Sequence, residues 1–262
     1  MNVFDFSKYK LKKRKISMIT CYDHYSAKII AATDIDCILV GDSAAMVMHG
    51  CESTIGATVD MIASHVEAVS KGAPGKFIVA DMPFLTVRKD KKHAMKCVET
   101  IVRAGANAVK IEGVAGHEKI ISHIIGSGVP VMGHLGLTPQ SVNGLGGYKV
   151  QGVSDEAKDA IMRDAEKLEK LGAFAVVLEC VPAGLAGIIS KKMNIAVIGI
   201  GAGPDIDGQV LVLQDMLGLT GDFKPKFLRK YLDGAAIFKT AIENYHKDVV
   251  SGSFPDDRES YE

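Results

Sequence analysis

The sequence lacks tryptophan, a Cys-x-x-Cys pair and an excess of charge of either sign. Its 31 basic and 31 acidic residues cancel, so no net field would draw the chain to nucleic acid or to an anionic membrane. No apolar run approaches the roughly 20 residues that cross a bilayer, and nothing after Met1 is typical of a signal peptide. The five cysteines have no metal-binding spacing, so we expect reduced thiols in a cytoplasmic protein.

What the sequence does contain is a large supply of core-forming residues in short runs. Apolar residues make up 47% of the 262 residues, and this length is typical of one (β/α)8 barrel. Runs rich in Val and Ile recur with room for a helix after each, which predicts parallel strands buried on both faces. The predicted strands are 16–20, 37–40, 77–80, 108–111, 129–132, 174–178, 196–200 and a weaker 210–213. The expected fold is therefore α/β, a single TIM barrel domain over residues 1–262.

Apolar residues recur at helical spacing between these strands, most clearly in 59–69, 94–101 and 161–171. Residues 227–232 and 237–245 are expected to form the closing helices of the barrel.

Two stretches do not fit the repeat. The glycine-rich stretch 134–152 is too long for a simple connection and is predicted to be functional or disordered. The acidic tail, about 251–262, is predicted to be mobile.

Four of the predicted strands end on a carboxylate, at Asp42, Asp81, Glu112 and Glu179. In a parallel barrel these strand ends meet at one rim, where such barrels carry their chemistry. A single acid is most simply a helix cap or an ion-pair partner. Three on adjacent strands, Asp42, Asp81 and Glu112, would repel one another without a cation, and Mg²⁺ suits oxygen ligands. The pattern predicts a metal site formed by these three acids.

Lys110 and Glu112 are two residues apart on one strand, so both side chains face the barrel mouth while Val109 and Ile111 face the helices. An inward lysine needs an anion, either a neighbouring carboxylate or the carboxylate of a substrate. A Schiff-base lysine is the alternative, but a metal site beside it favours an electrostatic role.

Glu179 ends the sixth predicted strand, across the mouth from the three acids. This placement suits a base that removes a proton from a substrate bound between them. The alternative is an ion pair between Glu179 and a local base. His134, at the end of strand five, could hydrogen-bond a substrate or Glu179, or be a satisfied structural donor.

Two further features leave their alternatives open. The glycines of 199–203 could cradle a phosphate or allow a tight turn. The lysines of 8–15 could belong to a solvated segment or to an anion-binding arm.

Six motifs at the predicted strand ends occur together in the chain. They are Val40-Gly41-Asp42-Ser43, Ala80-Asp81-Met82-Pro83-Phe84, Val109-Lys110-Ile111-Glu112-Gly113, Gly133-His134-Leu135-Gly136-Leu137-Thr138-Pro139-Gln140, Leu178-Glu179-Cys180-Val181-Pro182 and Ile198-Gly199-Ile200-Gly201-Ala202-Gly203. In their order and spacing the sequence resembles the ketopantoate hydroxymethyltransferase family, from about residue 19 to about residue 254.

The resemblance implies a barrel of the phosphoenolpyruvate/pyruvate type and a homodecamer. It implies transfer of a hydroxymethyl group from 5,10-methylenetetrahydrofolate to 3-methyl-2-oxobutanoate through a Mg²⁺-stabilised enolate, giving ketopantoate in pantothenate biosynthesis. By motif, Ser43 and Lys110 hold the oxo acid and Glu179 is the base. The acids Asp42, Asp81 and Glu112 surround the metal, and we expect Asp42, Asp81 and His134 to lie against the substrate as well.

Two other functions fit the same scaffold. A lyase of the phosphoenolpyruvate mutase or isocitrate lyase type also uses Mg²⁺ and an enolate, but it needs a mobile loop with a Lys-Lys-Cys-Gly-like motif that this sequence lacks. A barrel kept as a metabolite-binding scaffold would have a broken site, whereas every motif acid is present.

Overall fold

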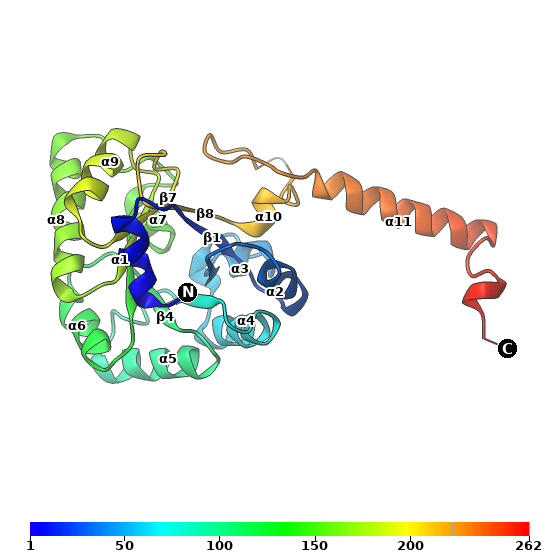
Figure 1. Cartoon of the computed structure of the whole chain (residues 1–262), viewed down its shortest axis with the longest axis horizontal. Coiled ribbons are helices and arrows are strands. Elements are labelled where there is room, and N and C mark those ends of the chain that lie inside the picture. The colour runs from blue at the N-terminus through cyan, green and yellow to red at the C-terminus, as the bar shows by residue number, and fades with distance from the viewer. Residues whose placement is uncertain (222, 262) are drawn as a thin grey trace. The chain divides into compact units, whose positions relative to one another are not determined.

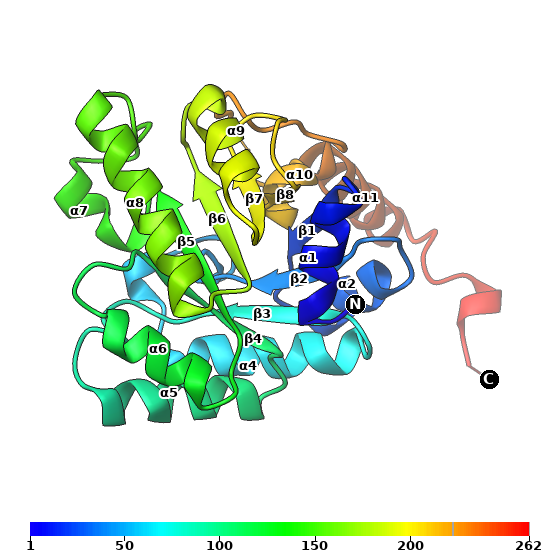
Figure 2. The same cartoon turned by 60° about the vertical axis from the view of Figure 1, so that its left-hand side comes forward.

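The computed structural model describes residues 1–221 and 223–261. The chain divides into two compact units, Met1–Val212 and the segment from Leu213 onward. The first unit is built on a closed barrel in which eight parallel strands follow one another in sequence order (Figures 1 and 2). The predicted fold class is therefore confirmed. Among the described residues, no helix combines the length and the apolar character needed to cross a membrane.

The strands lie close to their predicted positions. They are β1 (Ile16–Thr20), β2 (Cys37–Val40), β3 (Phe77–Asp81), β4 (Ala108–Glu112), β5 (Val131–Gly136), β6 (Ala175–Glu179), β7 (Ala196–Ile200) and β8 (Gly208–Leu211). Strand β5 starts two residues later than predicted because Pro130 has no N–H, although its carbonyl accepts from Val109 N at 3.0 Å. Strand β8 ends earlier than predicted because a helix already begins at Leu213.

Helices cover the outside of the strands (Figure 2). In this unit they are α1 (Val3–Leu11), α2 (His24–Ala31), α3 (Ala44–Val47), α4 (Val59–Gly72), α5 (Lys91–Arg103), α6 (Glu118–Gly126), α7 (Val142–Leu145), α8 (Asp155–Leu171) and α9 (Ala183–Lys192), with 3-10 turns η1 (Thr54–Gly56) and η2 (Pro139–Ser141). The three predicted helical stretches fall within α4, α5 and α8. Helix α8 is capped at both ends. The side chain of Ser154 accepts from Ala157 N at its start, and Gly172 adopts φ 96° at its end.

Helix α1, which periodicity did not reveal, covers the amino ends of the strands. Its Phe6 is fully buried, with its ring centroid 4.8 Å from that of Phe174 and 5.6 Å from that of Phe77. Its Lys10 Nζ lies 2.6 Å from Asp207 Oδ2. The lysine-rich segment is thus partly a structural element of the barrel.

The second unit contains α10 (Leu213–Met216), α11 (Gly234–Ser251) and η3 (Asp257–Glu259). The helix predicted for 227–232 was wrong: there the backbone turns, and Tyr231 N donates to Met216 O at 2.8 Å. The helix predicted for 237–245 lies within α11, but its apolar side chains are exposed, Ile242 by 68%. The mobility of the tail stays a prediction, and Glu262 lies outside the described residues.

Candidate active site

The barrel brings the predicted acids together at the carboxyl ends of its strands. Asp81 ends β3, Glu112 ends β4, and Asp42 follows β2 by two residues. All three are buried, with 2–8% of their surface exposed. The strand register places Asp81 beside Lys110 and Glu112 beside His134. The side chains singled out in the sequence therefore share one rim.

Asp42 and Asp81 are held together by the turn that follows β2. The N–H of Asp42 donates to Asp81 Oδ2 at 2.9 Å. A Cβ at Gly41 would lie 3.1 Å from Ser43 Oγ and 3.4 Å from Asp81 Oδ2, so a side chain there would crowd the site. Burial, and then the charges of Asp81 and Glu112, raise the pKa of Asp42 well above its usual range. The acids are crowded, as the sequence predicts.

Lys110 is the cation nearest these acids. Its Nζ lies 2.9 Å from Asp81 Oδ1, and the residue is 4% exposed. Burial lowers the pKa of Lys110, but the charges of Asp81, Glu112 and Asp42 outweigh burial and raise it. The ammonium therefore keeps its proton, which favours the electrostatic role over a Schiff base, since a Schiff base needs the neutral amine.

His134 lies between two carboxylates. Its Nε2 is 3.3 Å from Glu179 Oε2, and its Nδ1 is 3.4 Å from Glu112 Oε1 and 3.1 Å from Lys110 Nζ. Burial and Lys110 lower the pKa of His134, but its close contacts with Glu112 and Glu179 raise it to about 9. An imidazolium would donate to both carboxylates, whereas a neutral ring would accept from Lys110. The two carboxylates favour the imidazolium.

Glu179 ends β6, and 19% of its side chain is exposed. Its backbone is tightly fixed: its carbonyl accepts from Leu137 N at 2.8 Å, and a Cβ at Gly136 would lie 2.3 Å from that oxygen. Gly136 has φ +88°, a conformation that favours glycine. Glu179 is thus linked to Glu112 through the ring of His134 rather than separated from it by open space.

Ser43 lies directly after Asp42, and its Oγ is 2.7 Å from the hydroxyl of Tyr22. Tyr22 is 1% exposed and follows β1 by two residues. Sequence reasoning missed this tyrosine. The available signal was its position just past a predicted strand, on the same rim as the acids.

Gln140 was also missed as a site residue, although it belongs to one of the six motifs. Its side-chain Nε2 donates to Asp42 Oδ2 at 2.7 Å, and its backbone N donates to Glu112 Oε2 at 3.0 Å. The residue comes from the long stretch after β5, and no spacing rule indicates that it reaches acids on β2 and β4.

The donor set suits a hard cation that keeps some of its water. Within residues 1–221 and 223–261, no three His, Cys, Asp or Glu side chains form a ready-made metal cage. However, Asp81 Oδ1 and Glu112 Oε1 are buried oxygens whose contacts with Lys110 and His134 are not aligned hydrogen bonds. Mg²⁺ typically takes one or two carboxylates directly and fills its shell with water and substrate. The rim fits that mode of binding.

The glycines of 199–203 lie at the end of β7 and directly after it. A Cβ at Gly199 would lie 2.1 Å from Ile206 Cδ1, and one at Gly203 would lie 2.4 Å from Ala183 Cβ. Close packing therefore accounts for these two glycines without a phosphate.

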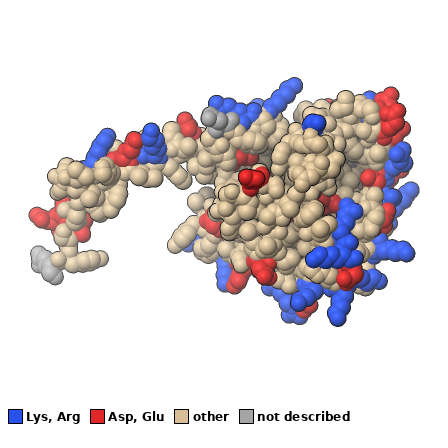
Figure 3. Space-filling model, turned by 180° about the vertical axis from the view of Figure 1, so that it is seen from behind, with Lys and Arg blue, Asp and Glu red and all other residues tan. Residues whose placement is uncertain are grey.

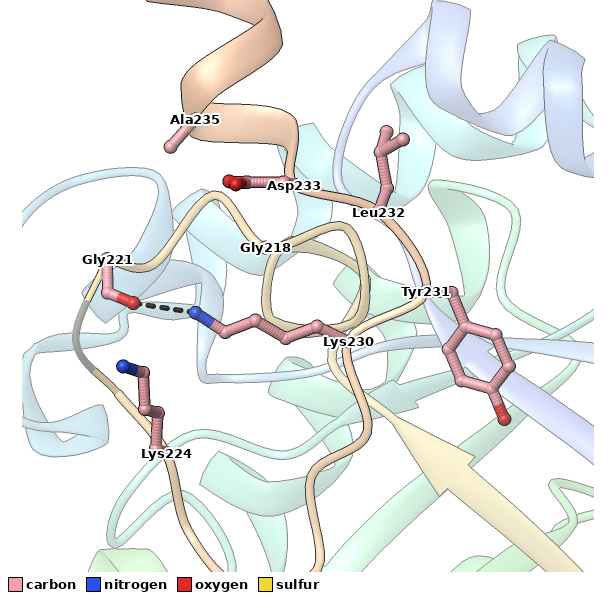
Figure 4. A pocket seen from close by; sticks show the side chains of 8 residues that line it. All are labelled: Gly218, Gly221, Lys224, Lys230, Tyr231, Leu232, Asp233 and Ala235. Carbon is pink, nitrogen blue, oxygen red and sulfur yellow. Dashed lines mark hydrogen bonds between the residues drawn. The ribbon is translucent and has the colours of Figure 1, made fainter.

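A separate hollow of about 630 Å³ lies within the second unit and is lined by Gly218, Gly221, Lys224, Lys230, Tyr231, Leu232, Asp233 and Ala235 (Figure 4). Lys230 Nζ donates to Gly221 O at 2.7 Å, and the ring of Tyr231 points away from both lysines. This hollow contains none of the predicted site residues. On the face shown in Figure 3, basic and acidic side chains are interspersed, in keeping with the balanced composition.

A sequence profile of the ketopantoate hydroxymethyltransferase family matches residues 1–257. The chain is 55% identical over 259 residues to 3-methyl-2-oxobutanoate hydroxymethyltransferase from Bdellovibrio bacteriovorus, covering 99% of this chain and 98% of that one. It is 52% identical over 256 residues to the protein of the same name from Coxiella burnetii, covering 97% and 96%. The chain belongs to the ketopantoate hydroxymethyltransferase family. It is therefore an enzyme, and the scaffold alternative falls away.

Solved structures with the same fold are more distant in sequence. Phosphonopyruvate hydrolase superposes with a TM-score of 0.64 at 10% identity, covering 99% of this chain and 93% of that one. A 2,3-dimethylmalate lyase of the PEP mutase/isocitrate lyase superfamily gives 0.63 at 15% identity, covering 99% and 91%. At such identities the likeness concerns the fold alone. It agrees with the expected eight-stranded α/β barrel.

Proposed function

We propose that this enzyme transfers a hydroxymethyl group from 5,10-methylenetetrahydrofolate to 3-methyl-2-oxobutanoate, forming ketopantoate in pantothenate biosynthesis. The observation that carries the proposal is the buried rim, where three acids and Lys110 lie at one end of a chain of contacts that leads through His134 to Glu179. The name shared by the relatives at 52–55% identity supports 3-methyl-2-oxobutanoate as the acceptor and hydroxymethyl as the group transferred.

Asp42, Asp81 and Glu112 are the residues that would hold Mg²⁺. Three carboxylates here face the ammonium of Lys110, and burial, followed by the charges of Asp81 and Glu112, raises the pKa of Asp42. A divalent cation would offset this negative charge. When bound, it supplies Lewis-acid stabilisation of the charge that develops on the keto oxygen of the oxo acid.

Lys110 and Ser43 would bind the oxo acid. The ammonium offers a charge-assisted donor to the substrate carboxylate, and the Ser43 hydroxyl offers a second polar contact whose orientation Tyr22 fixes at 2.7 Å. Because both groups lie on the rim next to Asp42 and Asp81, they would orient the keto oxygen toward the cation that these acids would hold.

Glu179 would take the proton from C3 of the oxo acid. General-base catalysis of this kind typically contributes about 10²–10⁴-fold. His134, 3.3 Å from Glu179 Oε2, would hold the carboxylate in place and stabilise its charge before the transfer. Water hydrolyses the aminal bridge of the folate, which releases tetrahydrofolate and formaldehyde. The carbon nucleophile left at C3 then adds to formaldehyde, and the resulting alkoxide takes up the proton to give the hydroxymethyl group.

The test is solvent exchange at C3 followed by NMR. With Mg²⁺ in D₂O and no folate, the enzyme should replace the C3 proton of 3-methyl-2-oxobutanoate by deuterium, and chelation should stop the exchange. Adding 5,10-methylenetetrahydrofolate should then yield ketopantoate. Cleavage of a 2-hydroxy or phosphono acid without folate would instead support the lyase alternative, and absence of exchange at any Mg²⁺ concentration would contradict the proposed mechanism.

We further propose a homodecamer in the cytoplasm. Apolar side chains of α11, among them Phe238, Ile242 and Val250, are 58–71% exposed, which supports burial against other copies of the chain. The five free cysteines suit a reducing compartment. Light scattering should give about 280 kDa for ten chains of 28.0 kDa, and Ile242→Asp should lower the mass. A monomer at micromolar concentration would contradict this assembly.

A further inference from the structure

Gln140 contacts residues at the carboxyl ends of three neighbouring strands of the barrel. It lies in η2, on the stretch between β5 and α8. Its side-chain Nε2 donates to Asp42 Oδ2 at 2.7 Å and to the carbonyl of Met82 at 3.0 Å, and its backbone N donates to Glu112 Oε2 at 3.0 Å. One residue therefore spans the ends of β2, β3 and β4.

The orientation of the Gln140 amide is settled by its partners. Both groups near the side-chain nitrogen, a carboxylate and a carbonyl, can only accept, so the NH₂ end must face them. This occupies one oxygen of Asp42 and leaves Oδ1 for another partner. The backbone N–H does the same for Glu112: it holds Oε2 and leaves Oε1, which lies 3.4 Å from His134 Nδ1.

The loop that carries Gln140 is anchored at both of its ends to the exit of β6. Leu137 N donates to the carbonyl of Glu179 at 2.8 Å, and Gln151 N donates to the carbonyl of Cys180 at 2.9 Å. Gln140 reaches from this anchored loop across the rim to Asp42 and Glu112. The distance between the proposed base and the proposed cation ligands is thus set partly by one loop.

We propose that Gln140 is a positioning residue of the cation site: by donating to one oxygen each of Asp42 and Glu112, it fixes which oxygens these carboxylates present to the cation. This inference rests on the proposed function only in requiring a divalent cation at these acids. Groups that orient metal ligands typically affect metal affinity by about 10- to 100-fold. Gln140 touches the ligands and not the reacting atoms, so its effect should appear in cation binding before any substrate is added.

The test is calorimetric titration of the full chain with Mg²⁺ or Mn²⁺ alone. Gln140→Met keeps the length of the side chain and the backbone N–H to Glu112, but it removes the side-chain donor to Asp42 and Met82. The cation affinity should therefore fall about 10- to 100-fold while the melting temperature without metal changes little. The matched control is Gln151→Met. The side-chain Nε2 of Gln151 also donates to a backbone carbonyl in the same loop, that of Lys149 at 3.0 Å, and not to the acids. Loss of this hydrogen bond should therefore leave the cation affinity unchanged.

The outcomes separate this inference from the proposed function. If the wild type binds no cation, the proposed cation site itself is refuted. If the wild type binds and Gln140→Met binds equally well, the positioning role is overturned. If Gln140→Met does not fold, Gln140→Asn tests the same point, because the shortened side chain keeps the polar loop but no longer reaches Asp42. An equal loss in the Gln151→Met control would show that the loop, and not the Gln140 amide, governs affinity.

Discussion

Both rims of the barrel carry charged groups, half-buried at the amino ends and buried at the carboxyl ends, but they differ in how well these groups are paired. At the amino-end rim, Asp207 Oδ2 accepts from Lys10 Nζ at 2.6 Å, from Val197 N at 2.9 Å and from Ser190 Oγ at 3.0 Å. At the carboxyl-end rim, buried oxygens of Asp81 and Glu112 lack an aligned hydrogen bond. Buried polar groups are normally hydrogen-bonded, so the carboxyl-end rim is the one that retains oxygens able to accept a further contact.

This difference suggests that the two rims of the barrel have different roles. The amino-end rim is closed by α1 and by the packed rings of Phe6, Phe77 and Phe174, and its charges are satisfied by the chain itself. The carboxyl-end rim carries more negative charge than its lysine offsets. We therefore expect substitutions at the first rim to change stability and substitutions at the second to change binding and catalysis.

The largest expected effect is that of Glu179→Gln. The amide keeps the shape of the side chain but cannot accept the proton, so exchange at C3 should fall by about 10²–10⁴-fold with oxo-acid binding nearly unchanged. Deuterium exchange followed by NMR, with calorimetry for binding, measures both quantities. Exchange at the wild-type rate would make another group, such as His134 acting through water, the base.

At the opposite rim, Phe6→Ala should destabilise the fold by about 3–5 kcal/mol, because it removes a fully buried ring from an aromatic cluster. Denaturant unfolding measures the loss. Phe4→Ala on the same helix is the matched control, since Phe4 is 81% exposed and its removal should cost at most about 0.5 kcal/mol. A similar cost for both variants would mean that α1 does not close the barrel.

Asp207→Asn should have a smaller effect, about 1–3 kcal/mol of stability. The amide oxygen can still accept from Val197 N, but the charge-assisted contact with Lys10 is lost. Asp34→Asn, at an exposed position near the same rim, should change stability by less than about 0.5 kcal/mol. If Asp207→Asn were as stable as the wild type, this ion pair would add nothing to the free energy of unfolding.

The smallest effect concerns pH. His134 has a pKa raised to about 9 from an ordinary value of 6.5, so its protonation stabilises the folded state below pH 6.5, and this contribution is lost as the pH rises toward 9 and beyond. The melting temperature of the metal-free enzyme should therefore fall over that range, by about 2–4 °C for each kcal/mol of stability lost. His134→Gln should flatten the profile. A wild-type profile that is already flat would instead favour a neutral ring that accepts from Lys110.

The sequence was sufficient for the parts of the molecule that repeat locally. The eight strands and the acids at their ends follow from short apolar runs, each of which carries its own signal. The faces of Lys110 and Glu112 follow from the alternation of side chains along a strand. The fold class and the acid cluster could therefore be predicted before any coordinates.

What could not be predicted depends on contacts between distant segments. Helix α1 is short, and its buried face amounts to Phe6, so periodicity gives little sign of it. Gln140 lies 98 residues from Asp42 in sequence, and no local pattern joins them. Residues 227–232 carry apolar side chains at helical spacing but bond to Met216, because tertiary contacts override a short pattern.

The most direct test of this difference between the rims is a Mg²⁺ titration of two variants that each convert one aspartate to asparagine, the buried Asp81 or the half-buried Asp207. In Asp81→Asn the side chain can still accept from Asp42 N, so the fold should persist while most of the Mg²⁺ affinity is lost. In Asp207→Asn the affinity should equal that of the wild type despite the lower stability. Equal affinities in the wild type and Asp81→Asn, or a similar loss of affinity in both variants, would contradict the account.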